Sequence, residues 1–437
     1  MLPFTARLAM PVAFTLAVAP AAGAQAPAAR VPSPIALGAP AAAFPRSFES
    51  VAAVRELSDG RVIVLDIDAR TVSLVDIAAG TAAPLGRSSA PAAEYVFPVA
   101  LLKLAGDTTL IVDPAGQRLV PVLGDGRTIA AIPIPDHLRA GQWRGADAQG
   151  RLYMQMRPGG MGGGPQAPQP DSLLVVRWDR ATGATDTVVR VKAPATMVVS
   201  DGMMQMVRPR PLATVDDWAV APDGALGIAR SADYHVEWLR GGTATKGAAV
   251  AYEPVPVVPA DVEAVNRIEA NPRGRIVTGP NGQPSMQEMP PPPVSAASDF
   301  PKVKPPFHGG SAHVAPDGSV WVRRSRAASE APMYDVFDAS GAHVRQVTLP
   351  MGSRIAAIGA RGIYLERVAE GGARLERHPI PRLPHRTAWR SRCAQSFSRR
   401  RCCLPSCWCP RRRSRRRECR WCRSARRPPS LRSRSTR

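Results

Sequence analysis

The first 392 residues of the chain contain no cysteine. This absence excludes disulfide bonds and cysteine-ligated metals from the body of the protein. The seven cysteines all lie in the C-terminal segment, as Cys393, Cys402, Cys403, Cys407, Cys409, Cys419 and Cys422.

Aromatic residues are scarce, at 5% of 437 residues, and no stretch after the N-terminus reaches the roughly 18 apolar residues that a membrane span needs. We therefore expect no membrane span. The 45% of hydrophobic residues is enough for a large core, which excludes a wholly disordered chain. The 46 prolines and 36 glycines indicate many turns.

The formal net charge of +22 is concentrated in one segment. Residues 386–437 hold 19 arginines, no lysine and one acidic residue, Glu418. The rest of the chain keeps 38 basic and 34 acidic residues, so the body is close to neutral. A nucleic-acid partner is therefore not expected of the body.

The N-terminus has the pattern of an export signal. Arg7 supplies the positive charge, residues 8–22 an apolar run, and Ala22-Gly23-Ala24 a small-residue cleavage site. We expect a signal peptide over residues 1–24, a disordered Ala/Pro-rich leader over 25–43, and a periplasmic or secreted protein. The alternative is that the whole N-terminus is an Ala/Pro-rich disordered leader.

A repeat organises the body. Its clearest copy has β-rich runs at 51–57, 61–66 and 71–77, with the turn Ser58-Asp59-Gly60 between the first two. Asp-Gly between such runs predicts a hairpin, because glycine accepts the positive φ of the turn. Further turns centre on Gly106, Gly150, Gly224, Gly318 and Gly362. Three of the five intervals are 44 to 46 residues, the size of a four-stranded propeller blade.

Insertions account for the two longer intervals. They are residues 158–171, the Met-rich stretch 196–210, and 280–306, whose four consecutive prolines, 290–293, should prevent pairing in a sheet. A helix is predicted from Pro259 to Asn271, and we reject Gly274 as a seventh turn. The sequence thus predicts an all-β, six-bladed β-propeller of four-stranded antiparallel blades over 44–384. We expect the ring to close with the strand near 44–57 completing the last blade.

The segments 106–119, 216–239, 313–325 and 361–381 resemble secreted bacterial six-bladed β-propeller proteins related to the NHL-type propellers. The resemblance covers about 44–384 and implies the fold, whereas the group's functions range over binding proteins, lactonases and lyases. Its gluconolactonase-like members hold a metal with carboxylates and Asn around the channel. That set is not found here, because Asn266, Asn271 and Asn281 lie in or beside an insertion.

One charged residue ends the second strand of each predicted blade, five to seven residues after the turn glycine. These candidate rim residues are Asp66, Asp113, Arg157, Arg230, Arg324 and Arg367. We expect them around the mouth of the channel, where arginines suit capture of a small anionic ligand. The alternative is structural, with the aspartates in Asx turns and the arginines paired with carboxylates or covering apolar surface.

No cofactor and no catalytic motif is identified, which leaves enzymatic activity open. His308 and His313 are five residues apart across a glycine pair and form no metal motif. A divalent metal held in the channel by residues from several blades is the alternative.

The tail over 385–437 has two interpretations. We favour translation in a wrong reading frame of GC-rich DNA, since Arg, Ser, Cys and Trp accumulate while Lys, Asp, Val and Gly are absent. A genuine tail would bind polyanions such as nucleic acid through its arginines. Either way we expect disorder.

Three functions follow. The first is an exported binding or scaffold module whose small anionic ligand or protein partner contacts the loop face around the channel. The second is a propeller hydrolase or lyase with a channel metal. The third is polyanion binding through the tail.

Overall fold

The structure is a computed structural model that describes residues 33–86, 94–159, 169–200, 205–270, 273–278, 284–289 and 293–381. The predicted signal peptide and the Arg/Cys-rich tail lie outside the described residues, as does most of the first insertion, 160–168. None of the helices in these ranges has both the length and the apolarity to cross a bilayer.

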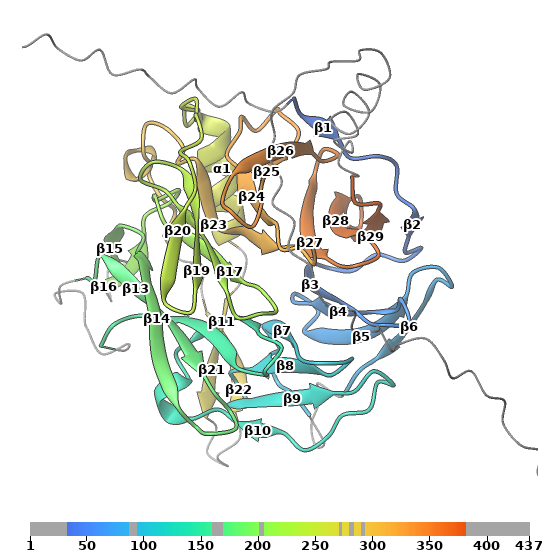
Figure 1. Cartoon of the computed structure of the whole chain (residues 1–437). Coiled ribbons are helices and arrows are strands. Elements are labelled where there is room, and N and C mark those ends of the chain that lie inside the picture. The colour runs from blue at the N-terminus through green and yellow to red at the C-terminus, as the bar shows by residue number, and fades with distance from the viewer. Residues whose placement is uncertain are drawn as a thin grey trace, which may run out of the picture. The chain divides into compact units, whose positions relative to one another are not determined.

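The body is an all-β, six-bladed propeller, which confirms the predicted fold (Figure 1). Blades 1 to 3 are β3 (Val51–Glu56), β4 (Val62–Asp66), β5 (Thr71–Asp76), β6 (Thr81–Pro84); β7 (Ala100–Lys103), β8 (Thr109–Asp113), β9 (Arg118–Val122), β10 (Ile132–Pro133); and β11 (Gln142–Ala146), β12 (Leu152–Met156), β13 (Ser172–Trp178), β14 (Thr185–Lys192). Blades 4 to 6 are β17 (Asp217–Val220), β18 (Leu226–Arg230), β19 (His235–Arg240), β20 (Thr243–Lys246); β23 (Phe307–Val314), β24 (Val320–Arg324), β25 (Met333–Phe337), β26 (His343–Thr348); and β27 (Ser353–Ile358), β28 (Ile363–Ala369), β29 (Gly372–His378). The first strand of each blade contacts the first strands of both neighbouring blades, so these six strands form the inner ring.

The N-terminal segment closes the ring. Its strand β2 (Ala42–Ala43) pairs antiparallel with β29 as the fourth strand of blade 6. The preceding β1 (Ile35–Ala36) adds to blade 5, parallel to β26. The prediction that the strand near 44–57 completes the last blade is confirmed in part, because Phe44 and Phe48 bond to the backbone of β29. The rest of that range needs correction, because β3 is the inner strand of blade 1. The expected disordered leader likewise forms these two strands near its end, where the free edges of blades 5 and 6 offer backbone partners.

Glycine in the left-handed region makes most of the first hairpin turns. Gly60, at φ 98°, and Gly318, at φ 79°, are two of five predicted turn glycines with positive φ. The preceding aspartate accepts the N–H beyond the turn, as from Arg61 to Asp59 at 2.9 Å. The sixth predicted turn glycine, Gly362, is not left-handed in blade 6.

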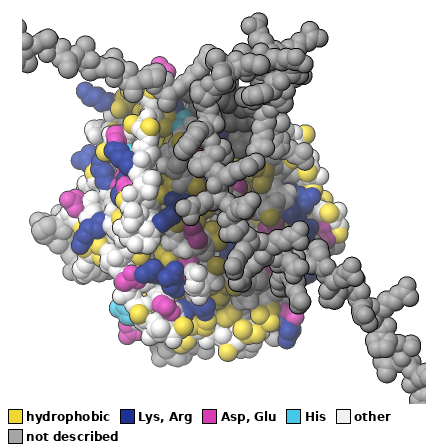
Figure 2. All heavy atoms as spheres, in the orientation of Figure 1, with side chains coloured by type: hydrophobic (Ala, Val, Ile, Leu, Met, Phe, Trp, Pro, Cys, Tyr) yellow, Lys and Arg dark blue, Asp and Glu magenta, His cyan; other side chains and the backbone are white. Residues whose placement is uncertain are grey.

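The core lies between the blades rather than within them. The second strands of blades 1 and 2, β4 and β8, are buried along their whole length because a neighbouring blade covers each face. Each apolar cluster joins adjacent blades, as where Trp321 of blade 5 packs with Ile355 and Leu365 of blade 6. On the outer surface, charges of both signs intermix (Figure 2), in keeping with the nearly neutral body.

The insertions form structure of their own. Strands β15 (Thr196–Ser200) and β16 (Gln205–Pro209) pair in a hairpin, and α1 (Pro259–Glu269) matches the predicted helix. Two short 3₁₀ helices span Asp136–Leu138 and Ala297–Asp299. The expectation that 280–306 cannot pair in a sheet was wrong in part, because β22 (Pro284–Met289) pairs with β21 (Arg273–Thr278) ahead of the prolines.

Candidate functional site

Five of the six candidate rim residues lie at or just beyond the end of a second strand, as predicted, whereas Arg367 lies two residues before the end of β28. None of the six lies on a strand of the inner ring. Asp66 pairs in register with Val51 of the inner strand, and Arg324 likewise with Phe307. One strand therefore separates these side chains from the channel. Within the described ranges no hydrogen bond or ion pair joins any two of the six.

Asp66 and Asp113 hold loops together in blades 1 and 2. The Asp66 carboxylate accepts the N–H groups of Glu49 and Ser50 at 2.8 and 2.9 Å. Asp113 does the same for Val96 and Phe97, both at 3.0 Å. Both carboxylates are buried and tie the entry of the inner strand to the end of the second strand. Their contacts are those of the structural alternative.

The four candidate arginines each contact a neighbouring side chain. Arg230 binds Asp216 at 3.0 Å and Glu237 at 3.1 Å, Arg324 binds Asp335 at 2.8 Å, and Arg367 binds Glu376 at 3.3 Å. The exposed Arg157 donates to Gln169. Anion capture by the six together stays a prediction.

Arg324 lines a cavity of about 560 Å³, which we call the α1 cavity. Its walls are α1, the ends of β24 and β28, and the connections that lead into β23, β25 and β27. Its charged, polar and exposed apolar lining includes Asp261, Ile268, Lys304, His308, Arg323, Ser325, Arg326, Glu330, Met351, Arg354, Glu366 and Val368. A volume of this size is typical of small-molecule sites.

A second cavity of about 610 Å³ lies beside the hairpin β15–β16 and is walled by prolines and short loops. Both cavities are lined by Leu212, whose backbone is left-handed at φ 51°. A leucine in this conformation is strained, and such strain gathers at functional sites. We take the α1 cavity as the candidate site because charged groups with defined partners line it.

Helix α1 makes polar contacts at both ends with the chain segments that flank it. Pro259 opens the helix, and Asp261 accepts the N–H of Val258 at 3.0 Å, satisfying one free donor of the first turn. Near the other end Asn266 brackets the backbone of Ser295, donating to its carbonyl at 3.1 Å and accepting its N–H at 3.0 Å. These bonds hold the wall in place.

Three cations in the cavity are matched by carboxylates that also line it. Lys304 binds Asp261 at 2.7 Å, Arg326 binds Glu330 at 2.6 Å, and Arg354 contacts Glu366. The fourth, Arg324, is paired with Asp335 from within blade 5.

Arg323 is the remaining cation of the cavity, and none of these carboxylates is paired with it. It precedes Arg324 on β24, so its side chain points to the opposite face of the blade, toward blade 6. In the part of the chain that the structure describes, no hydrogen bond or ion pair engages its guanidinium. Neither sequence position nor composition distinguishes Arg323 from Arg324, so the sequence reasoning missed it.

His308 and Ser325 form a second notable contact in the cavity. Nε2 of His308 lies 3.1 Å from Oγ of Ser325, a distance suited to a nucleophile and its base. Burial, and then the charges of Arg323 and Lys304, lower the pKa of His308 to about 4. The imidazole is therefore neutral at pH 7 and a weak base, which favours a neutral hydrogen-bonding role.

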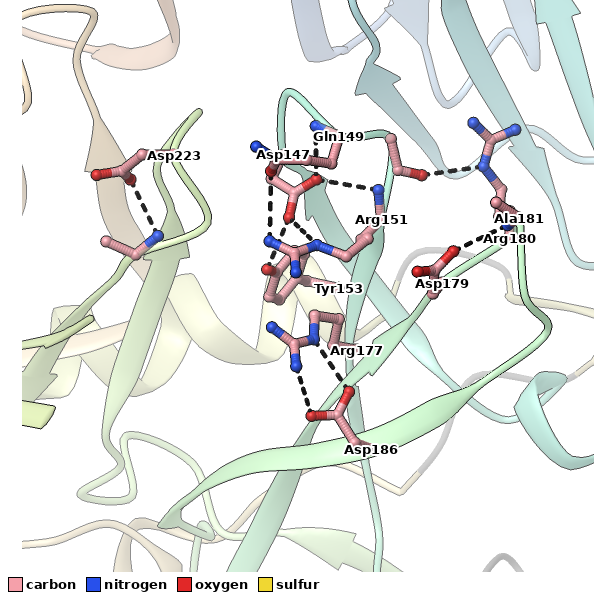
Figure 3. Close-up of polar contacts among 12 residues, drawn as sticks. Asp147, Gln149, Arg151, Tyr153, Arg177, Asp179, Arg180, Ala181, Asp186 and Asp223 are labelled. Carbon is pink, nitrogen blue, oxygen red and sulfur yellow. Dashed lines mark hydrogen bonds and ion pairs between the residues drawn. The ribbon is translucent and has the colours of Figure 1, made fainter. Parts of the chain in front are cut away.

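Another polar cluster lies at the first hairpin turn of blade 3 (Figure 3). Asp147 accepts from Nε of Arg151 at 2.6 Å and from the hydroxyl of Tyr153 at 2.9 Å. Burial, followed by the hydrogen bond to Asp147, raises the pKa of Tyr153 to about 12. Arg177 is matched with Asp186 on the adjacent strand at 2.8 Å. The contacts are mutual, so we interpret this cluster as structural.

Among the described residues no group of three or more His, Cys, Asp or Glu side chains is placed to hold a metal. Two further histidines are buried or half-buried in the described chain. Burial lowers the pKa of His313 to about 4, and His378 lies 2.9 Å from Glu376. The channel metal stays a hypothesis from the sequence.

No family model matches the chain, and no curated protein is similar to it in sequence. Solved six-bladed propellers are distant matches. The calcium-binding protein regucalcin from Agrobacterium tumefaciens is 11% identical, with a TM-score of 0.38, over 80% of this chain and 98% of that one. A gluconolactonase from Xanthomonas campestris is 12% identical, with a TM-score of 0.40, over 81% and 99%. An exported protein from Bacteroides fragilis is 10% identical, with a TM-score of 0.38, over 79% and 94%. Likenesses at this level carry no argument about activity.

Proposed function

We propose that the protein is a binding module that takes up a small anionic ligand in the α1 cavity. The observation that carries the proposal is the unmatched guanidinium of Arg323 in a cavity whose other cations have carboxylate partners. A guanidinium offers two parallel N–H donors to a carboxylate, phosphate or sulfate, so one free arginine is enough to orient such a group.

The neighbours of Arg323 support this function. Ser325 and the neutral His308 add hydrogen-bonding groups beside the guanidinium without adding charge. The matched pairs Lys304–Asp261 and Arg354–Glu366 keep the walls rigid, so they need not rearrange when a ligand enters.

The test is binding of acetate, phosphate and sulfate at low ionic strength, by calorimetry, to the wild type and to Arg323→Ala. We expect the variant to lose at least about tenfold in affinity, as for the loss of one charge-assisted pair. Arg374→Ala is the matched control, because Arg374 is exposed on β29 outside the cavity. Equal affinities of the wild type and Arg323→Ala would refute the proposal.

A second candidate is a hydrolase, favoured by the Ser325–His308 contact alone. A fluorophosphonate would form a phosphonyl ester with the Ser325 oxygen and release fluoride, with the proton passing to His308. Labelling of the wild type and not of Ser325→Ala would support the hydrolase. The low pKa of His308 counts against it.

Export belongs to the same proposal and rests on the N-terminal sequence. A mature protein beginning at Gln25 in the periplasm or medium would support it. Polyanion binding by a genuine tail is a separate proposal. It requires the 3′ end of the gene to confirm the reading frame and a chain ending at Pro384 to lose the binding.

A further inference from the structure

We infer that the ligand of the α1 cavity is an amphipathic anion, with an acidic head group and an apolar body; this rests on the anion binding proposed above. The cavity combines two kinds of surface. Its lining includes the charged and polar groups described above, which we call the polar end, and three exposed apolar side chains, which we call the apolar edge.

The apolar edge consists of three side chains that are open to solvent. Ile268 is 71% exposed, Met351 53% and Val368 72%, and all three line the cavity. They come from separate elements, namely α1, the turn before β27, and β28. Only a few large hydrophobic residues of the described chain are this exposed, so their meeting around one cavity indicates a surface that a ligand covers.

The polar end combines buried groups with Arg323, whose side chain is exposed at the end of β24. Lys304 and Ser325 are 6% and 5% exposed, and His308 contacts Ser325. Arg323 is near enough to His308 for its charge to lower the pKa of the imidazole. Because Arg323 and the apolar edge line one cavity, a ligand whose acidic head group binds Arg323 can place its apolar body against that edge.

A small molecule fits these features better than a membrane surface does. The apolar side chains surround a concave cavity instead of forming one protruding face. The carboxylates of Asp261, Glu330 and Glu366 are each paired with a cation of the cavity, so Arg323 is left as a single positive charge instead of the basic cluster that an anionic bilayer attracts. A single head group can bind Arg323 while avoiding these carboxylates.

The test is a series of straight-chain carboxylates from acetate to octanoate, with octyl phosphate and the neutral octanol, measured by calorimetry below their aggregation limits. We expect the affinity for carboxylates to rise by up to about fourfold per methylene until the edge is covered. Octanol should bind far more weakly than octanoate, because it lacks the charge that Arg323 recognises.

Two near-isosteric variants test the apolar edge without disturbing the core. Met351→Gln and Val368→Thr should each flatten the dependence on chain length and leave acetate binding unchanged. Val344→Thr is the control, since Val344 is 36% exposed and lies outside the cavity.

The outcomes separate the two proposals. Affinity that depends on Arg323 but not on chain length would refute the amphipathic ligand and leave anion binding intact. Affinity that depends on neither would refute both. Binding to phosphatidylglycerol vesicles that the same two variants abolish, with no binding of free octanoate, would assign the apolar edge to a membrane surface and overturn this inference.

Discussion

Nζ of Lys304 lies 2.7 Å from Oδ1 of Asp261, and the two residues are only 6% and 8% exposed. Lys304 also donates to the carbonyl of Arg326 at 2.9 Å, while the other oxygen of Asp261 accepts the N–H of Val258. This buried pair therefore connects the start of α1 to the segment before blade 5 and to the loop after β24.

Replacing Asp261 by Ala should destabilise the protein by about 3–5 kcal/mol, because it leaves a buried ammonium without its counter-charge. The free energy of unfolding from urea denaturation measures this. Lys302→Met, at an exposed neighbouring lysine, should stay within about 0.5 kcal/mol of the wild type. The double variant D261L/K304M should recover much of the loss; a double variant as unstable as Asp261→Ala would contradict the assignment.

Arg323→Met should raise the pKa of His308 from its value of about 4, since it removes one of the two positive charges that disfavour the imidazolium. Histidine side-chain NMR across a pH titration would follow the change. Arg374→Met should leave the same resonance unmoved. An unchanged His308 pKa in Arg323→Met would show that Arg323 does not contribute to it.

The protein should lose stability as the pH falls from about 6.5 to about 4. His308 and His313 both have pKa values lowered to about 4, so the unfolded chain takes up their protons first and is favoured over this window. Each histidine contributes at most about 1.4 kcal/mol per pH unit. Denaturation midpoints measured at each pH should fall less steeply for His308→Gln than for the wild type.

At alkaline pH the polar cluster of blade 3 should make the protein lose stability as the pH rises (Figure 3). Tyr153 has a pKa raised to about 12, so its contribution to stability is complete below pH 10 and is lost as the pH rises toward 12. Asp147→Asn removes the nearby negative charge and should therefore lower the pKa of Tyr153, although burial still holds it above 10. The pH range over which stability is lost should become narrower. Ultraviolet titration of phenolate formation, with Tyr153→Phe subtracted, would detect the earlier ionisation. The same onset in both proteins would contradict the role of Asp147.

Phe44→Ala should destabilise the propeller by about 3–5 kcal/mol, because Phe44 is 3% exposed and packs with Val54 of blade 1 and Leu375 of blade 6. Thermal denaturation measures the loss, and Val344→Ala, at an exposed position of blade 5, should change little. A stable Phe44→Ala variant would mean that the N-terminal segment is dispensable for closure.

The fold was largely predictable because each blade carries local signals. Asp59-Gly60 marks a hairpin whatever surrounds it, and the buried run 62–65 requires cover on both faces. Ring closure was harder to predict from the sequence, since Ala42–Ala43 has neither β propensity nor an alternating apolar pattern. The segment pairs only because β29 offers a free edge.

The candidate site could be predicted only in part. Arg324 was found from its place after the turn glycine, but its partner Asp335 lies on the next strand and Arg323 faces the other way. Helix α1 was predicted from Pro259 and its apolar spacing. Its position over blades 5 and 6 depends on distant residues, such as Lys304 and Ser295, that no local pattern connects to it.

The pairing of β2 with β29 also determines the order in which parts of the propeller can fold. The N–H of Val51 donates to Glu366, which is 315 residues away in the sequence. Strand β2 likewise pairs only with β29, which is synthesised near the end of the propeller. The segment made first by the ribosome is therefore among the last to find its partner, and until blade 6 exists the early blades hold an open edge. The ring of blades therefore cannot close until blade 6 has been synthesised.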